Sequence, residues 1–515
     1  MFGSLRNIAR LAGIVRTLGR HDALFADRVS GLAPGLGWMA RRLSRRGVPG
    51  RPGERLAAAL TELGPSFIKL GQALSTRADL VGEEVSTDLA RLQDRLAPFP
   101  SDAAVATIEA ELGRPVDVLF AAFDPTPVAG ASIAQVHYAV TVDGRDVAVK
   151  VLRPDIEGRF RRDLDLFAWV ARLMETVYPP IRRLRPIEIV ALFERSVRLE
   201  MDLRMEASAA SEFRANFADE PDYRIPKVDW DRTGRRVMTV ERFRGVRFDA
   251  KEAILASGHD LDGILTLASR ALFNQVFRDG FFHADLHPGN MLVLEDGAIG
   301  VVDFGIMGRI DMKTRRYLAD MLLGFLDRDY RRVARVHFDA GYVPADQSID
   351  LFTQAVRSIG EPLHDKPLQE ISVGRLLAQL FQVTAQFRMQ TQPQLLLLQK
   401  SMLTAEGVGR RLDPTVNIWD LARPLIESWM RENRGPEAIA AERIASLLDT
   451  LERLPAVVRD AETALATIAD GGLRLHPESL RVVLDGWSRR RARAVWALGA
   501  AVAAVAAAVA LVALA

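Results

Sequence analysis

Two aspartates and an asparagine near the middle of the chain form its most specific chemical pattern. In His283-Ala-Asp285-Leu-His287-Pro-Gly-Asn290 the aspartate and the asparagine are five residues apart, and Asp303-Phe304-Gly305 follows thirteen residues after Asn290. This spacing is typical of phosphoryl-transfer catalytic loops, where the aspartate faces the acceptor and the asparagine oxygen completes a metal site. Asp303 would be the main Mg²⁺ ligand, because hard cations prefer carboxylate oxygen. Together the motifs predict a site for ATP and a divalent metal ion.

A lysine and a glutamate are expected to complete this site. The run Asp146-Val-Ala-Val-Lys150-Val resembles the kinase strand whose lysine contacts the α- and β-phosphates. A lysine on an apolar strand could instead be a surface residue, but the downstream motifs favour the phosphate role. Its partner should be a glutamate on the long helix that follows. Glu206 is the first choice, with Glu200 and Asp202 as alternatives.

The loop expected to cover the phosphates is poor in glycine. It reads Val128-Ala-Gly-Ala-Ser-Ile-Ala-Gln-Val136 and has one glycine where protein kinases use three. Fewer glycines give a stiffer backbone and a less open approach to the phosphates. The predicted nucleotide contacts are Ala129, Gly130, Ala131, Ser132, Ile133, Ala134, Gln135, Val136, Lys150 and Glu241.

The elements around these residues follow the order of a two-lobed kinase. Helical spacing from Glu54 to Leu96 comes first, broken at Gly64-Pro65. A hairpin, a long helical stretch and another strand follow, and then a largely helical region that contains a second hairpin. These elements are predicted at His137–Val142 with Asp146–Leu152, Pro186–Asn216, Arg236–Phe243, and Met291–Leu294 with Ile299–Val302.

This order predicts an α+β, two-lobed protein-kinase-like fold with an N-terminal helical extension, a largely helical C-terminal lobe and one C-terminal transmembrane helix. The 515 residues are enough for several domain-sized units. The predicted segments are a basic arm and linker (1–53), a helical extension (54–125), an N-lobe (126–245), a C-lobe (246–430), a C-terminal helical region (431–493) and the transmembrane helix (494–515).

Composition excludes several classes of site. The chain has no cysteine, which rules out disulfides, thiol nucleophiles, iron–sulfur clusters and Cys-ligated zinc. Its formal net charge is only +2, so it has no global signature of a nucleic-acid-binding protein. A folded enzyme in a reducing compartment fits these facts, and no nucleic-acid partner is expected.

The C-terminal residues suggest a membrane anchor. Ala494 to Ala515 carry no charged side chain, and about 20 apolar residues suffice to cross a hydrocarbon core. The arginines at 489–491 and 493 favour a cytoplasmic position for the residues before the span. The prediction is therefore an inner-membrane protein with a single C-terminal span and a cytoplasmic soluble domain. The alternative is an Ala-rich helix that packs against the soluble body.

Several motifs together resemble the UbiB family, which are atypical kinase-like proteins of ubiquinone (coenzyme Q) biosynthesis. The resemblance covers about residues 54–419. The motifs that carry it, in chain order, are Lys69-Leu-Gly71-Gln72, Ala131-Ser-Ile-Ala-Gln-Val136, Glu200-Met-Asp202, His283 to Asn290, and Asp303-Phe-Gly305.

The resemblance implies that the Lys69–Gln72 helix folds over the site, with Lys69 and Gln72 near the Glu200/Asp202 pair. Such a helix would exclude a bulky protein substrate. The catalytic residues would be Asp285, Lys150, Glu206 and Lys69, the metal ligands Asn290 and Asp303, and the cofactors ATP (or ADP) and Mg²⁺. Implied partners are membrane lipids, quinone precursors and other ubiquinone biosynthesis proteins, and a homodimer is left open.

The sequence also departs from the family. Gly130 replaces an alanine usual in the loop, which leaves nucleotide preference open. Leu286 stands where the family often has proline, and one span is evident where bacterial relatives often have two. Without the resemblance, Lys69 would be interpreted as a surface helix residue.

Three other functions remain to be weighed. A small-molecule phosphotransferase of the aminoglycoside or choline kinase type shares Asp-Leu-His-Pro-Gly-Asn, but it gives no reason for the Lys69–Gln72 helix. A non-catalytic, ATP-switched scaffold is opposed by the filled catalytic positions. A flavin-dependent polyprenylphenol hydroxylase should show a strand followed by G-x-G-x-x-G, and none is present.

Overall fold

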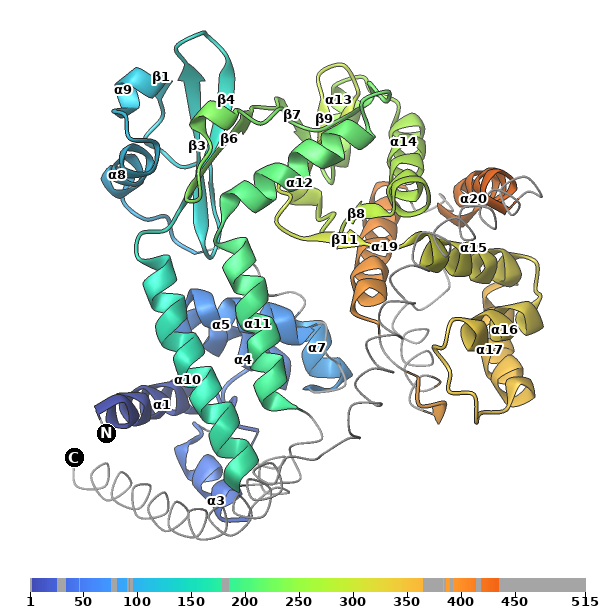
Figure 1. Cartoon of the computed structure of the whole chain (residues 1–515), viewed down its shortest axis with the longest axis horizontal. Helices are drawn as coiled ribbons and strands as arrows, with labels where there is room; N and C mark the ends of the chain where they lie inside the picture. Colours follow the sequence, from blue (N-terminus) through green and yellow to red (C-terminus); the bar gives the residue numbers. More distant parts are fainter. Residues whose placement is uncertain are drawn as a thin grey trace, which may run out of the picture. The chain divides into compact units, whose positions relative to one another are not determined.

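The computed structural model describes residues 2–25, 34–45, 47–75, 81–89, 92, 96–177, 185–364, 383, 386–389, 392–413 and 418–434 (Figure 1). The chain divides into two compact units. One comprises Met1–Leu166 with Leu192–Arg431, and the other Phe167–Ala191 with Glu432–Ala515. All residues of the candidate site belong to the first unit.

The N-terminal part of the first unit is helical, as predicted from Glu54 onward, whereas the segment 1–53, predicted as a basic arm and linker, also contains the helices Phe2–Arg20 and Pro34–Leu43. Gly64, at φ 103°, ends one helix, and Pro65 opens the next, where its missing N–H costs no hydrogen bond. A Cβ on Gly71 would lie 2.7 Å from Leu60 Cδ1, so glycine allows these two helices to approach closely. The helices are α1 (Phe2–Arg20), α3 (Pro34–Leu43), α4 (Pro52–Leu63), α5 (Pro65–Ser75) and α7 (Glu83–Leu89).

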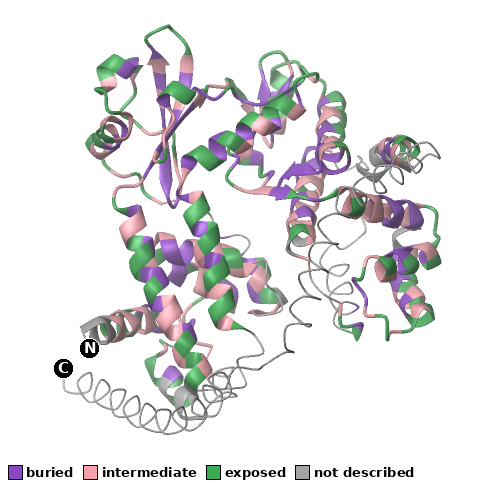
Figure 2. Cartoon of the chain, viewed as in Figure 1, coloured by how far each residue is buried: buried purple, intermediate pink, exposed green. Residues whose placement is uncertain are grey.

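An antiparallel five-stranded sheet follows, with the order β1-β3-β4-β6 and with β2 paired to β3. The predicted hairpin is present, and Gly144 in its turn has φ +85°. Figure 2 shows buried residues concentrated in the long strands. The bounds are α8 (Ser101–Leu112), α9 (Val116–Leu119), β1 (Phe120–Phe123), β2 (Ala129–Gly130), β3 (Ala134–Thr141), β4 (Asp146–Leu152) and β6 (Val237–Glu241).

The helical stretch predicted from Pro186 to Asn216 is in fact two helices, α11 (Pro186–Glu200) and α12 (Leu203–Asn216). The break occurs because Asp202 is an N-cap: its carboxylate accepts a hydrogen bond from the backbone N–H of Arg204 at 3.2 Å. A further helix, α10 (Ile156–Val177), was not predicted.

The remaining elements form two small sheets and a set of helices. Strands β5-β10-β9-β7 make one sheet, which contains the predicted second hairpin with Gly297 in its turn, and β11 pairs with β8. The strands are β5 (Tyr223–Arg224), β7 (Gly245–Arg247), β8 (Phe281–His283), β9 (Met291–Leu294), β10 (Ile299–Val301) and β11 (Met307–Arg309). The helices are η2 (Trp230–Arg232), α13 (Lys251–Ala256), α14 (Leu261–Phe273), π-helix η3 (Asn274–Asp279), η4 (Pro288–Asn290), α15 (Met312–Leu326), α16 (Tyr330–Asp339), α17 (Ile349–His364), α19 (Pro393–Leu412) and α20 (Ile418–Arg434).

The prediction of a C-terminal span and an inner-membrane location needs correction. Within the described ranges, no helix combines the length and apolarity that crossing a bilayer requires. The predicted span, residues 494–515, lies outside the described residues, as do residues 435–493. The membrane prediction is therefore not retained.

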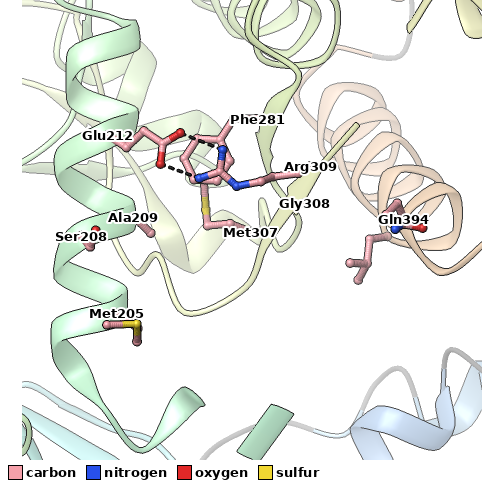
Figure 3. Close-up of a pocket in the computed structure, with 10 residues that line it drawn as sticks. Met205, Ser208, Ala209, Glu212, Phe281, Met307, Gly308, Arg309 and Gln394 are labelled. Atoms are coloured by element: carbon pink, nitrogen blue, oxygen red, sulfur yellow. Dashed lines mark hydrogen bonds and ion pairs between the residues drawn. The ribbon is translucent and has the colours of Figure 1, made fainter. Parts of the chain in front are cut away.

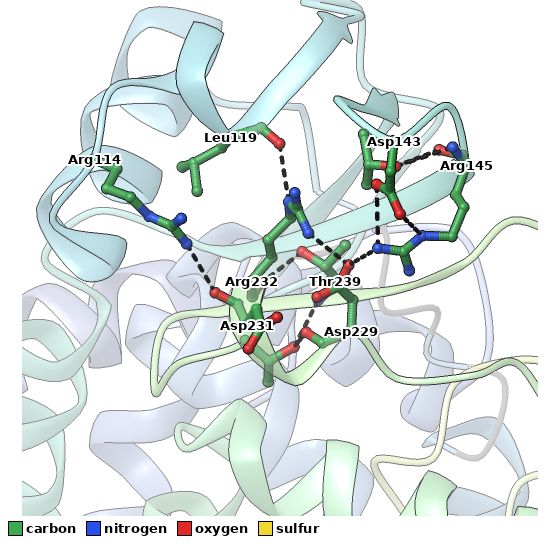
Figure 4. A network of polar contacts seen from close by, with 10 residues as sticks. Arg114, Leu119, Asp143, Arg145, Asp229, Asp231, Arg232 and Thr239 are labelled. Carbon is green, nitrogen blue, oxygen red and sulfur yellow. Dashed lines mark hydrogen bonds and ion pairs between the residues drawn. The ribbon is translucent and has the colours of Figure 1, made fainter.

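A charge network around the buried Asp229 links the segment beside β6 to the β3–β4 turn and to the start of β1 (Figure 4). The carboxylate of Asp229, 5% exposed, accepts hydrogen bonds from Arg232 and Arg145, both at 2.9 Å. Arg232 also donates to the carbonyl of Leu119 at 2.9 Å, next to β1. Buried charges are tolerated when each is paired, so this network depends on Asp229.

We expect Asp229→Ala to lower the free energy of unfolding by about 3–5 kcal/mol, because it leaves the Arg232 guanidinium buried without its carboxylate. Asp231→Ala, at an exposed position two residues away, is the matched control and should change stability by about 0.5 kcal/mol or less. Denaturant unfolding of both purified variants measures the difference. A loss below about 1 kcal/mol for Asp229→Ala would contradict this account.

Candidate active site

Lys150 on β4 joins two acidic side chains from distant parts of the chain. Its Nζ lies 2.6 Å from Glu206 Oε1 on α12 and 3.3 Å from Asp303 Oδ1. Glu206, and not Glu200 or Asp202, is therefore its helical partner, as the first choice predicted. The structure brings together three of the residues that the motifs singled out.

The charges of this cluster shift one another. Burial opposes the Lys150 charge, but Asp303 and Glu206 outweigh burial and raise the pKa of the ammonium. Lys150 lowers the pKa of Asp303 to about 2, against the effect of burial. Burial raises the pKa of Glu206. One ammonium thus faces two carboxylates, and this local excess of negative charge suits a divalent cation.

The catalytic-loop residues are fixed by hydrogen bonds to buried groups. His283 is fully buried; its Nδ1 accepts from the backbone N–H of Asp285 at 3.1 Å, which assigns the proton to Nε2, 2.6 Å from the carbonyl oxygen of Asp303. Burial lowers the pKa of His283, which keeps the ring neutral. Gln275, in the π-helix, accepts from the backbone N–H of His283 at 3.1 Å and donates to the Tyr223 hydroxyl. These bonds link the loop to the Asp303 turn.

Asp303 has a strained backbone that its neighbours maintain. Its φ is +66°, in the left-handed region that non-glycine residues rarely adopt. The backbone N–H of Gly305 donates to its carboxylate at 3.2 Å. The ring of Phe304 is buried, and its centroid lies 5.8 Å from the ring centroids of both Phe213, on α12, and His283. These contacts orient the carboxylate towards Lys150.

The two predicted metal ligands present suitable oxygen atoms. The amide nitrogen of Asn290 donates to the carbonyl of Asp285 at 3.1 Å, which leaves its amide oxygen available. Asp303 is 48% exposed, and among the described residues nothing donates to its Oδ2. Within the same part of the chain, no three His, Asp or Glu side chains form a metal cage. The donor set fits Mg²⁺ that shares its coordination with phosphate oxygens and water.

Residue Lys400 of α19 was not singled out from the sequence. Its Nζ lies 2.9 Å from Asp285 Oδ1, and the next residue, Ser401, donates to the carbonyl of His283 at 3.2 Å. A lysine two residues after the apolar run from Leu395 to Leu398 was the available signal, because such a cation needs a partner. Because Lys400 and Asp285 are far apart in the sequence, their pairing could not be predicted from it.

The alanine-rich loop is held by Arg153, another residue that the sequence reasoning missed. Its guanidinium donates to the carbonyls of Ala131 at 3.0 Å and Ala97 at 2.9 Å. A Cβ on Gly130 would lie 3.0 Å from the carbonyl oxygen of Leu96. Gly130, the residue that departs from the family pattern, therefore lies where the loop passes close to the backbone of Leu96.

Several predicted nucleotide contacts have structural partners in the described residues. Gln135 is fully buried and exchanges hydrogen bonds with the backbone of Phe99 and with His137. Ser132, in contrast, is fully buried, and its hydroxyl has no hydrogen-bond partner within the described ranges. Glu241 accepts from the backbone N–H of Lys227 at 3.2 Å. Nucleotide contact by these residues stays a prediction.

Lys69 on α5 reaches the end of α11. Its Nζ lies 2.8 Å from Glu200 Oε2, and the two side chains are only 10% and 20% exposed. The predicted proximity of Lys69 to Glu200 is therefore present. The break at Asp202 explains how Glu200 can serve Lys69 while Glu206 serves Lys150. The role of Lys69 in catalysis stays a prediction.

A cavity of about 390 Å³ opens between α12, strands β8 and β11, and α19 (Figure 3). Its lining combines apolar side chains with one ion pair, Arg309 with Glu212. The other lining residues are Met205, Ser208, Ala209, Phe281, Met307, Gly308, Gln394 and Leu397. Two of the lining residues lie close in sequence to the site: Phe281 precedes His283 by two residues, and Leu397 stands one turn before Lys400 on α19. A mixed lining of this kind suits a small amphipathic molecule.

Comparison with known proteins identifies two matching family models. Residues 91–337 match the ABC1 atypical kinase-like domain, and residues 356–417 match the UbiB helical domain. The second match contains the whole of α19. The first match, together with the elements described above, confirms a kinase-like fold of mixed helix and strand content.

Curated bacterial relatives cover most of the chain, and each bears the name "Probable protein kinase UbiB". The Marinobacter nauticus relative is 43% identical over 82% of this chain and 78% of its own length. The Azotobacter vinelandii relative is 40% identical over 90% and 87%. The Aliivibrio fischeri relative is 42% identical over 84% and 80%. Among solved structures, Rv3197 of Mycobacterium tuberculosis in complex with erythromycin is 26% identical, covers 70% of this chain and 92% of its own, and has a TM-score of 0.48.

We expect Gly130→Ala to destabilise the protein by about 1–3 kcal/mol, because the added methyl group forces the loop away from the Leu96 carbonyl. Gly13→Ala makes the same change inside helix α1 at a position with open space, and it should stabilise by about 0.5–1 kcal/mol. Thermal unfolding of both variants tests the prediction. Equal or higher stability of Gly130→Ala than wild type would refute it.

Proposed function

The chain belongs to the UbiB family of atypical kinase-like proteins implicated in ubiquinone biosynthesis, and we propose that it binds Mg²⁺ and ATP. In this proposal it transfers the γ-phosphoryl group to a small or lipid-like quinone precursor, or it hydrolyses ATP while it handles such a precursor. The observation that carries the proposal is the convergence of Lys150, Glu206 and Asp303, with Asp285 and Asn290 on the linked loop. Bound Mg²⁺ and ATP would supply the phosphoryl donor and its charge neutralisation.

Each residue of the site has a defined task in this proposal. Lys150 holds the α- and β-phosphates, and Glu206 keeps its ammonium in place. Asp303 and Asn290 offer oxygen ligands to the metal ion. Asp285 orients the acceptor hydroxyl and receives its proton. Preorganised charges of this kind are the main source of catalysis in phosphoryl transfer.

The acceptor in this proposal is not a protein. The contact of Lys69 with Glu200 ties the helical extension to the end of α11, which supports a site closed to bulky substrates. The cavity beside α19 supports a compact amphipathic acceptor such as a substituted phenol. A small-molecule phosphotransferase of the aminoglycoside or choline kinase type would share the catalytic loop, but it offers no role for the Lys69 contact.

Asp303→Asn should abolish the stabilisation that ATP gives in the presence of Mg²⁺, because the amide cannot replace the charged metal ligand. At a ligand concentration of about one hundred times Kd, wild type should gain about 2.7 kcal/mol. Asp296→Asn, the same exchange at the exposed turn of the β9–β10 hairpin, is the control and should respond like wild type. Thermal unfolding with and without Mg²⁺ and ATP is the measurement. A wild-type response from Asp303→Asn would exclude this metal assignment.

Quinone profiles of cells that lack the protein test the pathway. We expect reduced ubiquinone, restored by wild type and not by the Asp303→Asn variant, because the pathway role depends on the metal–nucleotide site. Normal ubiquinone in the deleted strain would reject the pathway assignment and leave the nucleotide site standing. Full rescue by Asp303→Asn would instead favour the scaffold alternative, in which the protein acts without catalysis.

A further inference from the structure

The catalytic loop of this protein contains no cation of its own. Between His283 and Asn290 the only charged residue is Asp285. His287 lies two positions after it, but its Nδ1 accepts a hydrogen bond from the backbone N–H of Gly289 at 3.1 Å. That ring nitrogen is therefore already engaged by the backbone of the loop itself.

Lys150 cannot provide this charge on the acceptor side. Its ammonium is already engaged by Glu206 and Asp303, and its side chain is only 17% exposed. Transfer of a phosphoryl group requires positive charge near its three equatorial oxygens as well as on the β-phosphate. The acceptor side of the site therefore needs a second cation.

Lys400 lies where that cation is needed. Its Nζ is 2.9 Å from Asp285 Oδ1, and both side chains remain partly exposed, at 39% and 36%. The helix is fixed beside the loop, because buried Ser401 donates to the carbonyl of His283. Adjacent residues of α19 thus contact both ends of His283-Ala-Asp285. The ammonium has a fixed position and can still reach a ligand.

We infer that Lys400 is the acceptor-side catalytic cation, which positions Asp285 and contacts the γ-phosphoryl oxygens of ATP. This inference rests on the proposed function. As the acceptor oxygen bonds to the γ-phosphorus, the bond from phosphorus to the β,γ-bridging oxygen breaks and ADP leaves. Asp285 Oδ2 takes the acceptor proton while Lys400 holds Oδ1 and neutralises the transferred group.

The inference gives a catalytic task to the helical region that follows the kinase-like part. Lys400 lies in residues 356–417, which match the UbiB helical domain, whereas Asp285 lies in the kinase-like match of 91–337. The site is incomplete without α19. This also explains why no lysine is needed in the catalytic loop itself.

Nucleotide binding separates a γ-phosphate contact from a purely structural role. We expect Lys400→Met to weaken binding of a non-hydrolysable ATP analogue with Mg²⁺ by about 10-fold or more, since a charge-assisted hydrogen bond is lost. Affinity for ADP should change by less than about twofold, because ADP lacks the group that Lys400 contacts. Lys400→Gln retains a hydrogen-bond donor for Asp285 without the charge, so it controls for misfolding of the Lys400→Met variant. It should also lose affinity for the ATP analogue and keep its affinity for ADP. Calorimetry on the full chain measures both affinities.

Turnover is the second measurement. It is the rate at which phosphate or ADP is released from ATP in the presence of Mg²⁺ and a phenolic quinone precursor. Lys400→Met and Lys400→Gln should lose about 100-fold or more in kcat, and Lys400→Arg should retain more than either. Lys313→Met, at an exposed position on α15 away from the site, is the control. Wild-type nucleotide selectivity and turnover in both neutral variants would overturn the inference. If wild type itself shows no Mg²⁺-dependent ATP binding, the proposed function fails first, so the two failures are distinguishable.

Discussion

The charge cluster around Lys150 is the interaction on which the site depends. Residues 150, 206 and 303 are far apart in the sequence, yet the Lys150 ammonium lies within 3.3 Å of both carboxylates. Removing charges from water is costly, and the cost is recovered only when the partners are held in good geometry. The sheet, α12 and the Asp303 turn must therefore be placed correctly at the same time. The cluster joins both parts of the kinase-like fold.

The rest of the site consists of devices that maintain this geometry. The break at Asp202 separates Glu200 from Glu206, so two neighbouring acidic residues serve two different lysines. His283 joins the catalytic loop to the strained Asp303 turn through its neutral ring. Strain of this kind persists only where the surroundings over-determine the backbone.

Local patterns made much of the fold predictable. The Asp143-Gly144 turn and the Gly64-Pro65 break have short-range causes, and both occur where predicted. The division of the long helical stretch was missed, because a capping aspartate within a helical pattern differs little from a surface residue. The contacts of Arg153 and Gln275 were missed as well. Arg153 binds backbone carbonyls, and Gln275 binds a backbone N–H and the hydroxyl of the distant Tyr223, none of which a sequence pattern reveals.

The sequence by itself determined the two hairpins, whose turns have local causes, and the spacing of Asp285, Asn290 and Asp303 that predicts a metal–phosphate site. Only the tertiary structure decided which charges meet. In the tertiary structure Lys150 forms an ion pair with Glu206 and not with Glu200, and Lys400 forms one with Asp285. Such pairings arise from the packing of elements distant in sequence, and contacts across 56 and 115 residues leave no periodic trace. Motifs can therefore indicate the candidate site, but packing decides which of its charged residues meet.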